Sequence, residues 1–284
     1  GMKSQHYSTI VLAHVTCVRQ EHAISVTEED GTAKLVAILL SAQKVDCKAR
    51  AASVLGNIAM DPSRAKDVGE AGATEPLIDL LKSDNRSAQQ AAAFALAGIA
   101  AGGKKNQDRV KDALGIDVLV QLLKVVVPTV AKENKDSAAM DPLQVHVQAN
   151  VAKALAELAR DNEVNQNAIA KDGGLLPLIS LVNHATSEQP KEEAAGALWQ
   201  LSSKNHENQS AIAAARGMES LVSLAGRTTA RGQEQAAGAL YSLALNHLEN
   251  QTQISQLLVQ LLRGSSASTD SQEKAARAIS RFAR

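Results

Sequence analysis

Aromatic residues are scarce in this chain of 284 residues, which has one Trp, two Tyr and two Phe. Because 45% of the residues are nevertheless hydrophobic, the core must consist mainly of Ala, Leu, Val and Ile. Strand-favouring aromatic side chains are almost missing and Ala is abundant, so the composition favours closely packed helices over sheets.

Other absences exclude further classes of protein. The two cysteines, Cys17 and Cys47, are too few for a disulfide framework or a zinc site. No apolar run is long enough to span a bilayer, and the first residues do not form a signal peptide. Thirty basic and thirty acidic residues balance, which argues against a nucleic-acid-binding or membrane-surface protein. We expect a soluble, reduced, intracellular protein in the cytoplasm, with the nucleus as a second location.

A leucine pattern, Leu-aliphatic-x-Leu-aliphatic, recurs along the chain. Its first leucines are Leu77, Leu119, Leu178, Leu221 and Leu258, with a looser copy at Leu35. The intervals are 42, 42, 59, 43 and 37 residues, and such near-equal spacing indicates internal repeats. An alanine-rich segment follows most copies. The dipeptide Asn-Gln opens four units, at Asn106, Asn165, Asn208 and Asn250.

Each unit predicts three helices. A short first helix begins near the Asn of Asn-Gln, whose side chain is expected to cap the amide groups of the first turn. A glycine is expected to end this helix in the left-handed conformation. The second helix carries the leucine stripe, with Pro76 and Pro177 near its start, and the third helix is rich in alanine. The glycines in question are Gly31, Gly72, Gly115, Gly173, Gly174 and Gly217.

Because no unit can bury its leucine stripe alone, neighbouring units must stack into one solenoid over residues 1–284. We predict about six three-helix units after a partial one. Their boundaries are 4–19 (partial), 20–60, 63–101, 106–160, 163–203, 206–245 and 248–284. The long interval is assigned to a surface loop, 125–143, between a second and a third helix, and we expect 126–141 to be the most mobile internal segment. Both ends interrupt a unit, so we expect a fragment of a longer protein.

The unit resembles the armadillo repeat. Residues 165–181 are similar to the first and second helices of that family, and residues 193–201 and 235–243 are similar to its third helix. The HEAT repeat is the alternative, but it usually has two helices and lacks this glycine. The resemblance implies an all-α, right-handed superhelix whose third helices line a concave groove for extended peptides or partner proteins. It implies no enzymatic activity.

Within this family, nuclear import adaptors of the importin-α type carry Trp and, four residues later, Asn in most third helices. The corresponding pairs here are Ser53 and Asn57, Phe94 and Gly98, Lys153 and Glu157, Gly196 and Gln200, Gly238 and Ser242, and Arg277 and Arg281. One Asn and no Trp remain, so we do not expect a ladder for a lysine-rich localisation signal. The chain looks more like vacuolar-tether and plant-type armadillo proteins, which act as scaffolds.

Three functions stay open at this point. The leading hypothesis is a non-enzymatic interaction scaffold. The second is a substrate-binding or regulatory segment of a larger enzyme, such as a ubiquitin ligase, and the third is an import adaptor. The surroundings of the gene would separate the first two, because a catalytic domain would have to lie outside these residues.

Motifs for chemistry are weak. Residues 98–105 come close to a phosphate-binding loop, but Lys105 stands where Ser or Thr would hold magnesium, and a helix rather than a strand is expected before it. We therefore predict a helix-ending turn and no cofactor. His206 and His247 are read as one position of a repeated loop, and no metal site is predicted.

Post-translational and catalytic motifs are equally weak. The formal glycosylation sequons at Asn85, Asn208 and Asn250 are interpreted as capping and turn residues. No nucleophile and base fall together in the helical pattern, so no catalytic residue is predicted.

The predicted groove is most developed near the carboxyl end. Trp199 and Tyr241 are 42 residues apart at one repeat position. Either both rings fill space left by Gly196 and Gly238 between neighbouring third helices, or they form a platform that anchors a partner. The full set of predicted groove residues is Asn57, Phe94, Lys153, Glu157, Gly196, Trp199, Gln200, Gly238, Tyr241, Ser242, Arg277 and Arg281.

These residues suggest the chemistry of a partner. The two glycines are expected to leave the third helices bare, so that a ligand backbone can approach closely. Gln200 and Ser242 would offer hydrogen bonds to an extended peptide. Two arginines beyond them favour an acidic segment. We expect an extended, partly acidic peptide over residues 196–281, and neither nucleic acid nor a small-molecule substrate.

Overall fold

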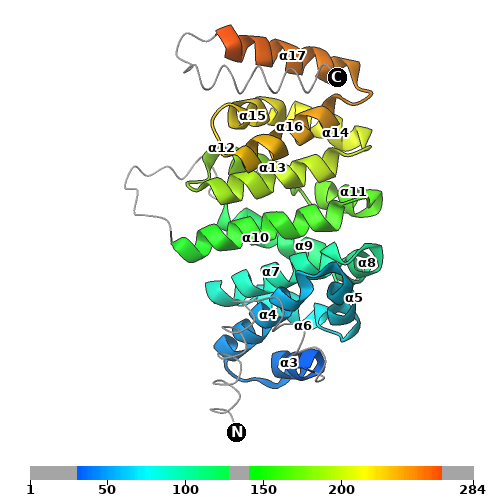
Figure 1. Cartoon of the computed structure of the whole chain (residues 1–284), viewed down its shortest axis with the longest axis vertical. Helices are drawn as coiled ribbons and strands as arrows, with labels where there is room; N and C mark the ends of the chain where they lie inside the picture. The colour runs from blue at the N-terminus through cyan, green and yellow to red at the C-terminus, as the bar shows by residue number, and fades with distance from the viewer. Residues whose placement is uncertain (1–30, 128–140, 264–284) are drawn as a thin grey trace. The chain divides into compact units, whose positions relative to one another are not determined.

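A computed structural model describes residues 31–127 and 141–263 of the chain (Figure 1). Its secondary structure within these ranges consists of fifteen α-helices and no strand, which confirms the all-α prediction. The predicted partial unit 4–19, residues 128–140 of the predicted loop, and Arg277 and Arg281 lie outside the described residues.

The described residues belong to two compact units. The first contains residues 31–126 and 141–158, and the second contains residues 127 and 159–263. Each is described by itself below.

The helices follow one another in the order first, second, third. The first helices are α5 (Pro62–Glu70), α8 (Lys104–Asp112), α11 (Glu163–Lys171) and α14 (His206–Ala214). The second helices are α3 (Gly31–Ser41), α6 (Thr74–Leu81), α9 (Gly115–Val126), α12 (Leu175–His184) and α15 (Gly217–Ala225). The third helices are α4 (Val45–Ala59), α7 (Arg86–Ala101), α10 (Pro142–Ala159), α13 (Glu188–Ser202) and α16 (Ala230–Ala244).

The last described helix departs from this order. α17 (Leu248–Arg263) runs for 16 residues from the Asn-Gln segment through the leucine stripe without a break. The sequence predicted a shortened first helix followed by a second one. Between them there is no glycine to end the first helix, so the two join into one.

The core is aliphatic. The first leucines of all six leucine stripes are at most 2% exposed. Alanines such as Ala52, Ala95, Ala195 and Ala239 are fully buried, and they let the third helices approach closely. Accordingly α4 packs along α7 in the first unit, and α13 packs along α16 in the second (Figure 1).

Only some of the predicted glycines take the left-handed conformation. Gly72 and Gly173 have φ of 82°, as predicted. Gly115 instead begins α9, and the residue before it, Leu114, has φ of 61°. Gly115 is needed for space, because a Cβ there would lie 2.8 Å from the carbonyl oxygen of Val110. Gly217 begins α15 in the same way, Gly31 begins α3, and Gly174 has φ of −72°, so the prediction is wrong at these four positions.

The Asn of Asn-Gln does not cap the first helix, contrary to the prediction. That role belongs to the residue three positions earlier: the side chain of Asn162 accepts from the backbone N–H of Asn165, and that of Asn205 accepts from the N–H of Asn208. Both distances, 3.3 and 3.0 Å, are those of a side-chain cap. The Asn of Asn-Gln therefore lies inside the helix, and its side chain has another role.

That role is to close the preceding third helix. Asn208 donates from Nδ2 to the carbonyl oxygen of Leu201 at 2.9 Å, and Asn250 donates to that of Leu243 at 2.8 Å. Asn106 does the same for Ile99. The last carbonyls of a helix have no partner within it, so these side chains supply the missing donors.

The adjacent Gln extends this contact to a second third helix. Gln209 donates from Nε2 to the carbonyl oxygens of Ser202 at 3.1 Å and Ser242 at 2.9 Å, which are the ends of α13 and α16. In the first unit, Gln107 donates to the carbonyl oxygen of Glu157. We call the Asn-Gln pair and the helix ends that it closes the Asn-Gln joint. Asn208 and Asn250 are 1% and 2% exposed and close the preceding third helix, so their interpretation as capping and turn residues is wrong. It is confirmed for the sequon at Asn85, whose side chain caps α7 by accepting from the backbone N–H of Ala88 at 3.0 Å.

Candidate functional site

In the first unit, Phe94 fills space between third helices. A Cβ added to Gly56 of α4 would lie 2.4 Å from a carbon of the Phe94 ring, so the ring of α7 lies directly on that glycine. Phe94 is half-buried. It therefore presents one edge of its ring while the rest packs on α4.

The other predicted positions of the first unit form a polar face. Asn57, Lys153 and Glu157 are all half-buried. Lys153 and Glu157 lie one turn apart on α10, so opposite charges stand next to each other on that helix. Asn150, one turn earlier, donates from Nδ2 to the carbonyl oxygen of Gln90 at 3.2 Å and joins α10 to α7.

In the second unit, Trp199 lies on Gly238. A Cβ added to Gly238 would lie 2.6 Å from ring carbons Cδ2 and Cε3 of Trp199. The indole of α13 therefore fills the space that this glycine leaves on α16, as the packing interpretation predicts. Trp199 is half-buried, so part of the ring still faces solvent.

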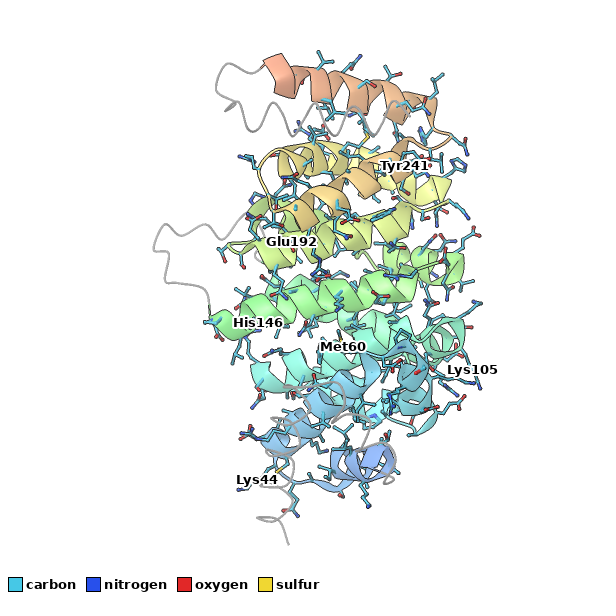
Figure 2. The ribbon with its side chains drawn as sticks, viewed as in Figure 1. Lys44, Met60, Lys105, His146, Glu192 and Tyr241 are labelled. Atoms are coloured by element: carbon cyan, nitrogen blue, oxygen red, sulfur yellow. The ribbon has the colours of Figure 1, made fainter. Side chains whose placement is uncertain are left out.

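Tyr241 behaves differently from Trp199, although it has the same repeat position. Its side chain is 52% exposed (Figure 2). It does not fill the space at Gly196, because a Cβ there would lie 2.7 Å from Oε1 of Gln235. The prediction that Tyr241 fills the space at Gly196 is thus wrong, and Tyr241 lies one helical turn from Gly238.

Two further expectations for this face are wrong. Gly196 and Gly238 do not leave the third helices bare, since Gln235 and Trp199 cover them. Ser242 is 4% exposed, so its hydroxyl is not available to a peptide. Gln200 is half-buried, and its carbonyl oxygen accepts from Gln166 at 2.9 Å.

A polar cluster at the start of α13 and α16 was not predicted from the sequence. Arg231 donates from Nη2 to Glu193 at 2.6 Å, and its Nε lies 4.0 Å from Glu192. Thr229, which caps α16, donates to Glu192. Both glutamates are 8% exposed. The adjacent glutamates Glu192 and Glu193 on an alanine-rich helix could have indicated this cluster, because buried carboxylates need hydrogen-bonding or charged partners.

Glu188 adds a surface carboxylate to this cluster. Its Oε1 accepts from Nζ of Lys191 at 2.8 Å, and its Oε2 accepts from the hydroxyl of Thr228 at 2.6 Å. These hydrogen bonds lower the pKa of Glu188 below its ordinary value, the one from Lys191 most strongly. The carboxylate is thereby kept ionised and tied to the segment that precedes α16.

The segment 98–105 is a turn between two helices, as predicted. α7 ends at Ala101, Gly103 has φ of 105°, and α8 begins at Lys104. Lys105 donates to Glu70 at 2.8 Å.

His206 and His247 do not share one place. His206 is the first residue of α14, whereas His247 stands where Asn205 caps that helix. Nδ1 of His247 accepts from the backbone N–H of Asn250 at 3.4 Å. Among the described residues, no group of three His, Cys, Asp or Glu side chains is placed to hold a metal ion.

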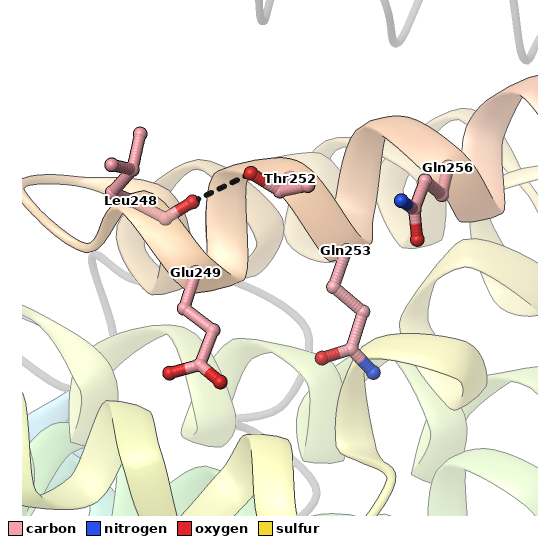
Figure 3. Close-up of a pocket in the computed structure, with 5 residues that line it drawn as sticks. All are labelled: Leu248, Glu249, Thr252, Gln253 and Gln256. Carbon is pink, nitrogen blue, oxygen red and sulfur yellow. Dashed lines mark hydrogen bonds between the residues drawn. The ribbon is translucent and has the colours of Figure 1, made fainter.

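An open hollow of about 600 Å³ lies along α17 (Figure 3). The residues that line it are Leu248, Glu249, Thr252, Gln253 and Gln256. All five come from one helix, and Leu248 is 78% exposed. The hydroxyl of Thr252 is engaged by the carbonyl oxygen of Leu248 at 3.0 Å. The hollow is part of the exposed surface rather than an enclosed binding cavity.

Within the described ranges, no helix is long and apolar enough to cross a bilayer. No family model matches the chain, and no curated protein matches its sequence.

Solved structures do match. An engineered protein is 30% identical with a TM-score of 0.76, and the match covers 98% of this chain but 64% of that one. A second engineered protein is 31% identical with a TM-score of 0.70, covering 89% of this chain and 96% of that one. A designed armadillo repeat protein in complex with the peptide (KR)4 is 24% identical with a TM-score of 0.68, covering 84% and 92%. Helix order, stacked third helices and these matches agree: the chain has an armadillo-like repeat fold.

Proposed function

We propose that this chain is a non-enzymatic interaction module that binds an extended segment of a partner protein on its third-helix faces. One observation carries the proposal: Tyr241 is 52% exposed and lies one helical turn from Gly238, on which the Trp199 indole packs. A large aromatic residue that stays exposed next to a rigidly held one resembles the anchors that dominate protein interfaces. Among the described residues, Tyr241 does not fill the space at a glycine as Trp199 does.

The comparison with known structures supports this proposal. The designed armadillo repeat protein was solved with the peptide (KR)4, so its fold can hold a peptide. Here the third helices lack the repeated Trp and Asn of import adaptors, and a scaffold that binds another class of peptide fits the residues better. The acidic segment expected near Arg277 and Arg281 rests on residues outside the described ranges. It stays a prediction, as do the likeness to scaffold-type armadillo proteins, the cytoplasmic location and the exclusion of nucleic acid.

Selection from a phage-displayed library of random dodecapeptides against the full chain tests the proposal. Trp199 is the only tryptophan, so its fluorescence reports binding at this face without a label. We expect selected peptides to change the Trp199 emission and Tyr241→Ala to weaken them about tenfold, the effect of an interface anchor. Leu176→Ala is the matched control, because Leu176 is also exposed, at 66%, but belongs to α12. Peptides that leave the emission unchanged and bind Tyr241→Ala normally would refute the proposal.

A further inference from the structure

The exposed side of α16 has two chemically different ends. Glu234, Gly238, Tyr241 and Leu245 follow one another at intervals of four, three and four residues. Residues at this spacing lie along one side of a helix. Glu234 is exposed at one end, and Tyr241 and Leu245 are 52% and 36% exposed at the other. Trp199 covers the glycine between them.

The end near Glu234 is negative. The helices α13 and α16 together hold four glutamates, one lysine and one arginine. Lys191 is engaged by Glu188, and Arg231 is shared by Glu192 and Glu193. Glu234 forms no ion pair with any part of the chain that the structure describes, so its carboxylate is available to a partner.

The other end carries no charge. Trp199, Tyr241 and Leu245 offer aromatic and aliphatic area, with the hydroxyl of Tyr241 as a polar tip. An aromatic or aliphatic side chain can bury area on these three residues. On helices α13 and α16, the cations are Lys191 and Arg231, and both are already engaged by carboxylates.

We propose that this face binds a segment that carries Lys or Arg opposite Glu234 and an aromatic or aliphatic residue on Tyr241. The proposal deepens the proposed function and rests on it. The seven residues from Glu234 to Tyr241 correspond to a rise of about 10 Å along the helix. A segment in the polyproline II conformation covers about that distance in three residues, and its side chains at i and i+3 lie on the same side. The basic and the apolar residue of the ligand are therefore three positions apart, and the chain direction decides which comes first.

The test uses the full chain and a dodecapeptide selected from the phage-displayed library. We expect selection to enrich Lys or Arg three positions from an aromatic or aliphatic residue. In fluorescence anisotropy, replacing that basic residue by Glu is expected to weaken binding about three- to fivefold, as for a solvent-exposed ion pair. Glu234→Gln should weaken the original peptide by a similar factor, and Glu234→Lys should restore binding of the peptide that carries Glu.

A matched control is available on the same unit. Glu163→Gln removes the same charge from an exposed position on α11, away from the third helices, and should leave the affinity unchanged. Selected peptides that depend on Tyr241 but not on Glu234, or that are enriched in acidic residues, would overturn this inference and leave the proposed function intact. If no peptide depends on Tyr241, both are overturned.

Discussion

The indole of Trp199 lies so close to Gly238 that any Cβ at that glycine would fall 2.6 Å from the ring. Trp199 is on α13 and Gly238 on α16, so the contact joins two neighbouring third helices. One helical turn from Gly238 on α16, Tyr241 remains 52% exposed. A packing contact and a candidate anchor thus adjoin on one surface, and mutations can separate them.

Replacing Gly238 by Ala is expected to lower the free energy of unfolding by about 1–2 kcal/mol, because the added methyl group overpacks the ring contact. Urea unfolding followed by circular dichroism measures this. In a Trp199→Ala background the same change should instead stabilise by up to about 1 kcal/mol, since Ala favours a helix more than Gly does. A destabilisation of equal size in both backgrounds would show that the ring does not lie on this glycine.

Gln209→Ala is expected to destabilise the chain by about 1–3 kcal/mol, because the carbonyl oxygens of Ser202 and Ser242 lose a buried donor. Thermal and urea unfolding would measure the loss. Gln189→Ala is the matched control, since Gln189 is exposed on α13, and it should change stability by less than about 0.5 kcal/mol. Equal effects of the two substitutions would contradict the role of the Asn-Gln joint.

His247→Asn is expected to stabilise α17 by about 0.5–1 kcal/mol, because Asn is among the strongest N-cap residues. The present cap is an imidazole at 3.4 Å from the N–H of Asn250. The reciprocal change, Asn205→His, should weaken α14 by more than this, because Nδ2 of Asn205 also donates to Gln166 and Asn167. Hydrogen exchange of the amides of both helices distinguishes a local effect from a global one, and unchanged exchange of the first α14 amides in Asn205→His would be inconsistent with this assignment.

Acid is expected to weaken the contact at Glu188. The pKa of Glu188 in the folded chain lies below its ordinary value of 4.5, because Lys191 and Thr228 donate to the carboxylate. This contribution to stability is complete above that ordinary value and is lost as the pH falls through the lowered pKa. Unfolding measured from about pH 6 to about pH 3 should show a smaller loss of stability for Glu188→Gln than for the unchanged chain. Parallel curves would rule out the contribution.

Most of the fold can be predicted from the sequence, because the leucine and alanine patterns repeat what each helix must bury. Leu77 and Leu119 are fully buried as the spacing requires. Side-chain direction at polar positions is harder, because it depends on which backbone groups a neighbouring unit leaves unpaired. The Asn of Asn-Gln illustrates this: its place near the start of a helix suggested a cap, but its side chain closes the preceding helix.

The candidate site was predicted less well for a related reason. Equal repeat positions suggested that Trp199 and Tyr241 fill the spaces at Gly238 and Gly196, yet Trp199 lies on Gly238 whereas Gln235, not Tyr241, lies at Gly196. Ser242 has the spacing of a groove residue but is 4% exposed. The link between Thr229 and Glu192 joins residues 37 positions apart, and no repeated pattern in the sequence indicates it.

The Asn-Gln joint also decides where this chain can be divided. The amides that close the carboxyl end of α13 come from Asn208 and Gln209, which belong to the following helix. A cut between α13 and α14 would expose the carbonyl groups of Leu201 and Ser202 without their donors, whereas a cut after α14 would retain both. A fragment that keeps these hydrogen bonds therefore ends one helix beyond the border of the sequence repeat.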